Sequence, residues 1–232
     1  MALAAEVKPL LESQCYQLEV PCPERWYLRL QDMPRISTTE LEQVVGRDIA
    51  SALPAGTDAA TWRRLLNEIQ MLLHQSAVNV DRDTRGLAPI NSLWFWGCGS
   101  TPAPIPQRWT SIHGTDLFLR GLTEIGGIAC LPVPSGANEC LANGEAEDRV
   151  LVVLENCRRA AAHQEVEMWS AAVRELEQRW FKPLASALQR GALQSLSLLT
   201  DGLELDVRPL SLLCLWRRQR TLASLAPGVA PP

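Results

Sequence analysis

Two apolar stretches of strand length place the strongest constraint on how this chain can fold. NSLWFWG carries large apolar groups on both faces of an extended backbone over residues 91–96, and DRVLVVLEN is almost continuously apolar over residues 148–156. Strands that are covered by helices on both faces have this pattern, whereas half-exposed strands alternate between apolar and polar residues. The sequence therefore predicts buried strands in a sheet with helices on each side.

Helical patterns follow each of these stretches. Residues 117–127 are expected to form a helix that ends at glycines, and residues 163–181 a longer helix that Pro183 kinks or interrupts. Short strands are expected at 128–134 and at the end of the chain, in SLSLLTDG, LELDV and LCLWRRQR. This alternation of strands and helices is typical of an α/β sheet domain. We expect the tail at 223–232 to be disordered.

The first 90 residues have a different pattern, that of a small α+β domain. Residues 59–76 carry one apolar stripe at three- and four-residue spacing, which predicts an amphipathic helix with Asp58 as its cap. Residues 26–30 alternate like a half-buried strand, and residues 77–90 are expected to be irregular.

Composition narrows the function classes. A net charge of −4 argues against a field that attracts nucleic acid or an anionic membrane. No apolar run approaches the roughly 20 residues of a membrane-spanning helix, so we expect a cytoplasmic protein without a membrane contact. The seven cysteines are irregularly spaced, which favours reduced thiols over a disulfide framework, and none of the three histidines forms a helical zinc pair.

Two local motifs have simpler interpretations than catalysis. GCGS at residues 97–100 follows the expected strand, but the prolines at 102, 104 and 106 prevent the helix whose N-terminus would hold a phosphate. A sharp turn is the favoured interpretation. Cys157 lies beside Arg158 and Arg159, yet an unreactive thiol is favoured there over a nucleophile.

The segment from 78 to 99 contains eight residues in a recognisable register. They are Val78, Asn79, Arg82, Gly86, Pro89, Asn91, Gly97 and Gly99. This run resembles the pattern of archaeal-type cofactor-independent phosphoglycerate mutases of the alkaline phosphatase superfamily. Over about residues 20–220 the chain looks still closer to an uncharacterised proteobacterial family that is described as phosphoglycerate-mutase-like and sometimes labelled regulatory.

The resemblance implies an architecture. Residues 1–88 would be a cap-like α+β domain, and residues 89–222 the latter part of a partial alkaline-phosphatase-like, three-layer sheet domain. The chain would then begin inside the cap, without the strands that carry the first metal-binding aspartate and the nucleophilic serine of the enzymes.

The later metal ligands of the mutase pattern can be checked by position. Glu155 is present, but Arg158 stands where the pattern has an aspartate, and His163 lies one place beyond the expected histidine position. Asp201 is present, whereas the histidine after it is replaced by Gly202. Phosphoryl transfer with two metal ions needs several fixed carboxylate or imidazole ligands, and an arginine repels a cation. We therefore predict no metal and no other cofactor, with Asp201, His163 and Glu155 as the fallback metal ligands.

Three functions remain open. The first is a non-catalytic, regulatory or binding protein that recognises a protein partner or a small phosphorylated ligand. The second is a metal-dependent phosphotransferase or phosphatase whose metal site is reduced or shared with another chain, so the sequence leaves open whether the protein is an enzyme. The third is self-association through an uncovered sheet edge. The candidate anion contacts are Asn79, Arg82, Asn91, Gly97, Gly99 and Arg158.

Overall fold

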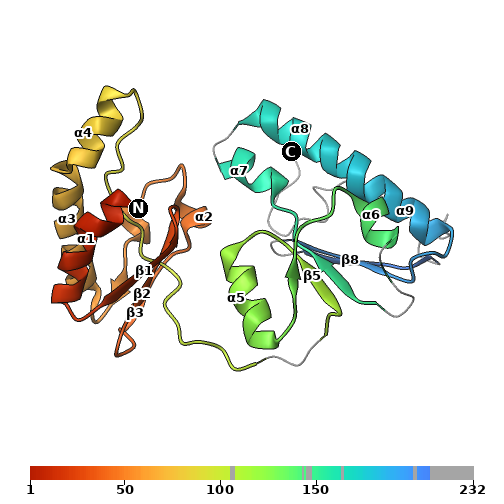
Figure 1. Ribbon diagram of the computed structural model, residues 1–232, viewed down its shortest axis with the longest axis horizontal. Helices are drawn as coiled ribbons and strands as arrows, with labels where there is room; N and C mark the ends of the chain where they lie inside the picture. Colours follow the sequence, from red (N-terminus) through yellow and green to blue (C-terminus); the bar gives the residue numbers. More distant parts are fainter. Residues whose placement is uncertain (105–107, 143, 145–147, 163–164, 201–202, 210–232) are drawn as a thin grey trace. The chain divides into compact units, whose positions relative to one another are not determined.

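The structure is a computed structural model that describes residues 1–104, 108–142, 144, 148–162, 165–200 and 203–209. The chain divides into two compact units, Met1–Pro102 and Ala103–Pro232 (Figure 1). Helices and a parallel sheet are both present, so the expected mixed α/β class is confirmed. Among the described residues, none of the helices combines the length and the apolar character needed to cross a bilayer.

The first unit is built from helices packed on short antiparallel strands. In chain order its elements are α1 (Ala2–Ser13), β1 (Gln17–Cys22), β2 (Arg25–Arg29), β3 (Ile36–Ser37), α2 (Leu41–Val44), a 3₁₀ turn (Ala50–Ala52), β4 (Ala55–Gly56), α3 (Ala59–His74) and α4 (Ala77–Thr84). β1 pairs with β2 and β3 pairs with β4, both antiparallel.

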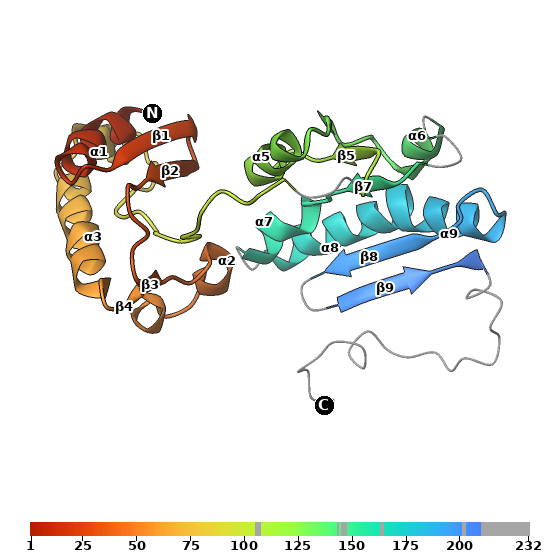
Figure 2. The same ribbon diagram turned by 90° about the horizontal axis from the view of Figure 1, so that it is seen from below.

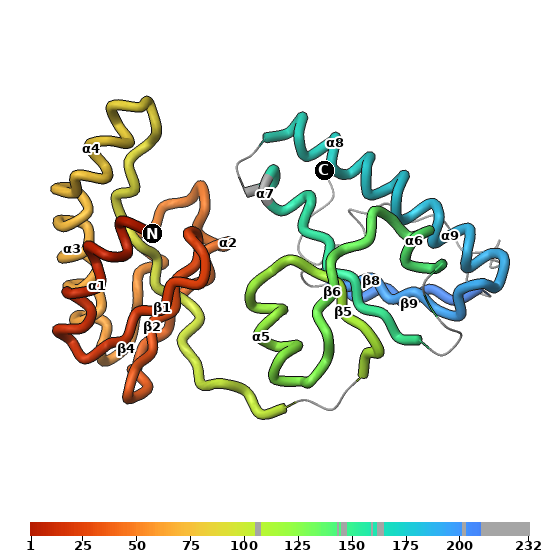
Figure 3. The backbone as a smooth tube through the Cα atoms, viewed as in Figure 1, coloured from red at the N-terminus to blue at the C-terminus, as the bar shows by residue number. Residues whose placement is uncertain are grey.

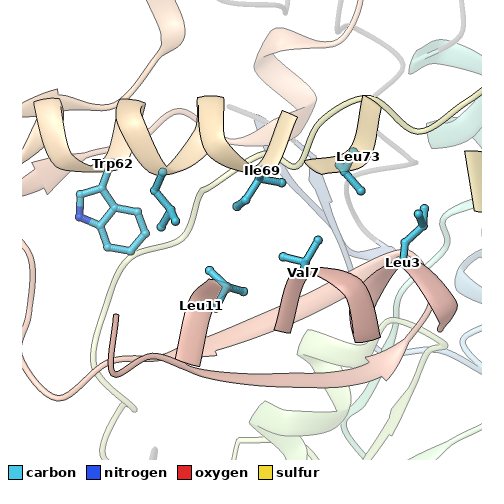
Figure 4. Close-up of a cluster of buried hydrophobic side chains, with 7 residues drawn as sticks. Leu3, Val7, Leu11, Trp62, Ile69 and Leu73 are labelled. Atoms are coloured by element: carbon cyan, nitrogen blue, oxygen red, sulfur yellow. The ribbon is translucent and has the colours of Figure 1, made fainter. Parts of the chain in front are cut away.

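The core of this unit lies between α1 and α3. Its buried residues are Leu3, Val7 and Leu11 from α1 and Trp62, Leu65, Ile69 and Leu73 from α3 (Figure 4). The apolar stripe expected over residues 59–76 is therefore the face of α3 that meets α1. On the hairpin, Leu18 lies opposite Leu28 and both pack against this core, which confirms the alternation expected for residues 26–30.

The prediction of a strand over residues 91–96 is wrong. The backbone there is irregular, and its aromatic rings pack on the first unit. Phe95 meets Trp62 edge to face at 5.1 Å between ring centroids, Trp94 Nε1 donates to Thr39 O at 2.8 Å, and Arg25 lies over the Trp96 ring. Leu93, Trp94 and Phe95 are thus partly covered by residues of the first unit, whereas Trp96 stays 39% exposed.

The same contacts move the boundary between the units. In Figure 3 the chain after α4 turns back and runs along the first unit before it continues to residue 103. Residues 89–102 thus belong with the first unit, whereas the sequence placed them with the sheet domain.

Residues 77–90 also differ from expectation, because they include a helix. α4 begins after Ser76, whose side chain accepts a hydrogen bond from Val78 N at 3.1 Å. A serine cap directly before the segment was the signal for this helix. Only two turns long, α4 offers no repeated apolar spacing that periodicity could detect.

The second unit contains a parallel sheet. Its elements are β5 (Ser111–His113), α5 (Leu117–Gly126), β6 (Cys130–Leu131), α6 (Ala137–Ala142), β7 (Val150–Val152), α7 (Asn156–Ala162), α8 (Val166–Leu176), a π-helical turn (Glu177–Phe181), α9 (Lys182–Gln189), β8 (Leu196–Thr200) and β9 (Leu203–Val207). The order β6–β5–β7 is parallel throughout, and β8 pairs with β9 as an antiparallel hairpin (Figure 2). The sequence analysis missed β5, the middle strand, because its sequence SIH lacks the long apolar run that predicted β7.

Two further expectations about this unit are confirmed. α5 ends at Gly127, which takes the left-handed conformation at φ 65°. The long helix is interrupted before Pro183, where Lys182 N bonds to Glu177 O across five residues. Proline has no N–H for the carbonyl four residues earlier, so this wider turn is where the helix accommodates it. The third late strand and the tail, in 213–220 and 223–232, lie outside the described residues.

Asp58 precedes α3 as expected, but its side chain makes no helix cap. Its carboxylate accepts from Arg35 N at 2.8 Å and from Arg35 Nη2 at 3.2 Å. The backbone hydrogen bond from Arg35, followed by the side-chain one, lowers the pKa of Asp58 below its ordinary value. A lowered folded-state pKa gives stability that is present above the unfolded value, about 3.9, and is lost as pH falls through the folded value.

The Asp58→Asn variant is therefore expected to lose stability less steeply than the wild type as the pH falls below about 4. Chemical denaturation at several pH values between roughly 5 and 2 measures this slope. Parallel curves for the two proteins over that interval would show that Asp58 and Arg35 are not coupled to folding.

Candidate functional site

The buried side chain of Asn79 links two backbone segments of the first unit, and we call this arrangement the Asn79 clasp. Its side chain is 5% exposed, and its Nδ2 donates to Leu73 O and to Ile90 O, both at 2.8 Å. Its Oδ1 accepts from Ile90 N, also at 2.8 Å. One side-chain amide thus bonds both backbone groups of Ile90 and fastens the end of α3 to the segment after α4. Both polar atoms of Asn79 are engaged by the protein itself.

Arg82 and Gly86 stabilise the C-terminal end of α4, also through hydrogen bonds to the backbone. Arg82 Nε and Nη2 both donate to Ala88 O, at 3.1 and 2.9 Å. Gly86 has φ 70°, Gly86 N bonds to Asp83 O, and Leu87 N bonds to Arg82 O. These two bonds form the Schellman pattern that ends a helix at a left-handed residue. The part of the mutase-like run around α4 therefore builds a turn, and its donors are directed at backbone carbonyls.

The other candidates of the first unit have fewer constraints. Asn91 is exposed. Gly97 takes φ 70°, the left-handed conformation, which explains a glycine there after the aromatic residues. A Cβ at Gly97 or Gly99 would meet nothing within 4 Å, so neither glycine is required by a close neighbour among the described atoms.

A polar cluster in the described part of the second unit lies where β5 and β7 end. The two strands are parallel, with His113 opposite Val152. Thr115 follows β5 and Glu155 follows β7, so both stand beyond the carboxyl ends of neighbouring strands. Open α/β sheets bind their ligands at this edge.

Two side chains, those of Thr115 and Arg158, meet there on the carboxylate of Glu155. Thr115 Oγ1 donates to Glu155 Oε2 at 3.1 Å, and Arg158 Nη1 donates to Glu155 Oε1 at 2.9 Å. The Arg158 and Glu155 side chains are 44% and 29% exposed, so the ion pair is accessible to solvent. Sequence reasoning selected Glu155 and Arg158 but missed Thr115. The signal for Thr115 was its place after β5, a strand that has no apolar run by which the sequence could reveal it.

A divalent metal does not fit the donors described at this edge. Glu155 is a single carboxylate whose two oxygens already accept from a guanidinium and a hydroxyl. Within the described ranges no three histidine, cysteine or acidic side chains gather closely enough to hold an ion. The other two fallback ligands, Asp201 and His163, lie outside those ranges. Burial raises the pKa of the nearby Cys157 thiol, which disfavours a reactive thiolate.

The candidates of the two units thus differ in kind. Asn79 and Arg82 hold the backbone of the first unit together. Arg158 and Glu155 form an accessible polar cluster in the second unit, an α/β unit with a parallel sheet and the polar edge typical of ligand-binding proteins of this class.

Comparison with curated proteins finds relatives of this chain. The chain is similar to 2,3-bisphosphoglycerate-independent phosphoglycerate mutases. It is 28% identical to that of Methanothrix thermoacetophila over 171 residues, which cover 66% of this chain and 43% of the relative. It is 32% identical to phosphoglycerate mutase 2 of Methanothermobacter thermautotrophicus over 98 residues, 39% of this chain and 24% of the relative. The chain spans less than half the length of these curated relatives.

No family model matches the chain. Among solved structures, a cofactor-independent phosphoglycerate mutase from Thermoplasma acidophilum is 19% identical and covers 77% of this chain and 54% of its own, with a TM-score of 0.33. The two sequence matches support the similarity to phosphoglycerate mutases that the sequence analysis expected.

Proposed function

We propose that this chain is a non-catalytic phosphoglycerate-mutase-like protein that binds a small phosphorylated ligand or a protein partner, as the regulatory-labelled proteobacterial family would. The proposal depends on one observation. At the position where the mutase pattern has a metal-binding aspartate, the guanidinium of Arg158 lies 2.9 Å from Glu155. A fixed cation at this place repels a divalent metal and offsets the charge of the one carboxylate that would attract it.

An arginine at the carboxyl end of a sheet suits a phosphorylated ligand instead. Guanidinium groups form charge-assisted, often paired hydrogen bonds with phosphate oxygens. The Thr115 hydroxyl is a second donor to the same place. This supports ligand binding without the two-metal chemistry of phosphoryl transfer.

Helix α8 supports the partner arm of the proposal. None of its residues is buried, and Val166, Trp169 and Val173 recur at three- and four-residue spacing while 72%, 44% and 37% exposed. Apolar side chains exposed together are typical of interaction surfaces. The partner is either another protein or a second copy of this chain, and light scattering at high concentration distinguishes a monomer from a self-associating chain. The six described cysteines are free thiols, which supports the cytoplasmic location that we propose.

The purified chain is expected to retain no stoichiometric metal after dialysis and to interconvert no phosphoglycerate in the presence of added Mn²⁺, Mg²⁺ or Zn²⁺. Elemental analysis and a coupled mutase assay measure the two results. Retained metal together with turnover would refute the proposal and favour the alternative, a metal-dependent phosphotransferase or phosphatase. In that case the Asp201→Ala variant should lose the activity.

A further inference from the structure

The cluster at the ends of β5 and β7 has the donors of an anion-binding site, and the Glu155 carboxylate of the protein itself occupies these donors. Thr115 Oγ1 and Arg158 Nη1 each donate to a different oxygen of the Glu155 carboxylate, at 3.1 and 2.9 Å. A hydroxyl and a guanidinium that converge on two oxygens of one group are the donors that proteins use for phosphate and carboxylate ligands.

We propose that Glu155 is a built-in occupant of this site, and that a phosphate group binds between Thr115 and Arg158 by displacing the Glu155 side chain. The inference rests on the ligand arm of the proposed function and names its chemistry, a phosphate dianion. Because Glu155 is tethered beside the donors, it competes with any free anion at a high effective concentration. The site is therefore selective for ligands that offer more charge or more oxygens than a carboxylate.

The surroundings permit this exchange. The pair is partly exposed, so the Glu155 side chain can leave the donors for solvent without crossing a packed core. The neighbouring Asp116 carboxylate accepts from Phe118 N and Leu119 N at the start of α5, at 2.8 and 3.2 Å, and is thus held by the helix. Removing the charge of Glu155 weakens its competition for the two donors and also removes a repulsion between that charge and the incoming phosphate.

The test is titration of the full chain with inorganic phosphate, followed by calorimetry or by amide chemical shifts. The Glu155→Gln variant is expected to bind phosphate about tenfold more tightly than the wild type, since a competing charge is lost. Adding Arg158→Gln or Thr115→Val to that variant is expected to reverse most of the gain. Glycerol 3-phosphate, titrated in parallel, distinguishes a site for phosphate esters, which then bind more tightly than free phosphate, from a site for free phosphate.

Glu175→Gln is the matched control. Glu175 is also a solvent-accessible carboxylate of the second unit, and its Oε1 lies 3.2 Å from Arg179 Nη1, but it belongs to helix α8 and does not follow β5 or β7 in the chain. It is expected to leave phosphate affinity unchanged. An equal effect of the two variants, or no gain for Glu155→Gln, would overturn the proposal. If Glu155→Gln fails to fold by circular dichroism, Glu155→Ala serves in its place with the same expected gain.

The outcomes are independent of the test of function. Phosphoglycerate turnover would end the proposal of a non-catalytic protein and leave this displacement result standing. The absence of a gain in phosphate affinity would end the displacement proposal and leave the assay of turnover unaffected.

Discussion

Replacement of Asn79 by alanine is expected to destabilise the protein by about 2 to 3 kcal/mol, because it removes three hydrogen bonds at a buried site. Both backbone groups of Ile90 lose the amide that pairs with them, and the end of α3 is no longer fastened to the segment after α4. Urea denaturation followed by tryptophan fluorescence measures the loss, since Trp62 lies in the core of the same unit.

Asn91→Ala is the control for this prediction. Asn91 belongs to the same mutase-like run but is exposed, so its replacement should change stability by less than about 0.5 kcal/mol. Asn79→Asp is a stricter variant, because a carboxylate can accept from Ile90 N but cannot donate to the carbonyls of Leu73 and Ile90. If Asn79→Ala were as stable as Asn91→Ala and instead lost affinity for phosphate, Asn79 would be a ligand contact, as the sequence suggested.

Gly56→Ala is expected to destabilise the first unit by about 2 to 4 kcal/mol. Gly56 has φ 115°, a conformation that residues with a side chain rarely adopt, and a Cβ there would lie 2.5 Å from Arg35 O. That oxygen belongs to the backbone and cannot swing aside as a flexible side chain can. The β3–β4 pairing, in which Gly56 lies opposite Ile36, would have to open.

Gly97→Ala separates the two causes of this loss. Gly97 also has a positive φ, 70°, but a Cβ there would meet nothing within 4 Å. Its replacement therefore measures backbone strain alone, about 1 kcal/mol. Thermal unfolding of both variants gives the comparison, and a Gly56→Ala protein no less stable than Gly97→Ala would contradict the close approach to Arg35.

The elements that the sequence predicted well are those with a repeated pattern. The helix α3 has six buried residues on one stripe, and its length leaves periodicity little ambiguity. The segment 91–96 shows the opposite case. Its three consecutive rings favour cover on two sides, but the pattern does not specify whether strands, helices or loops provide it. Here Trp62 packs on Phe95 and Thr39 O bonds to Trp94, while Trp96 stays 39% exposed.

The candidate site was predictable only in part. Asn79 and Arg82 were selected because they belong to the mutase-like run and carry hydrogen-bond donors, but the same donors bind backbone carbonyls equally well. Their actual partners depend on where the tertiary fold places the backbone of Ala88 and Ile90, which a sequence pattern does not specify. Glu155 and Arg158 are three residues apart at the start of α7, a spacing at which side chains meet, so their pairing was within reach of sequence reasoning.

The packing of Phe95 against Trp62 has a practical consequence for dissecting this chain. A fragment that stops at residue 88 would lack Phe95, the aromatic lid over Trp62, and would expose the Trp62 indole to water. A fragment that runs to Pro102 keeps that lid and the Asn79 clasp together. Any recombinant dissection or domain exchange should therefore cut among the prolines that follow the glycine pair, and not ahead of the tryptophans.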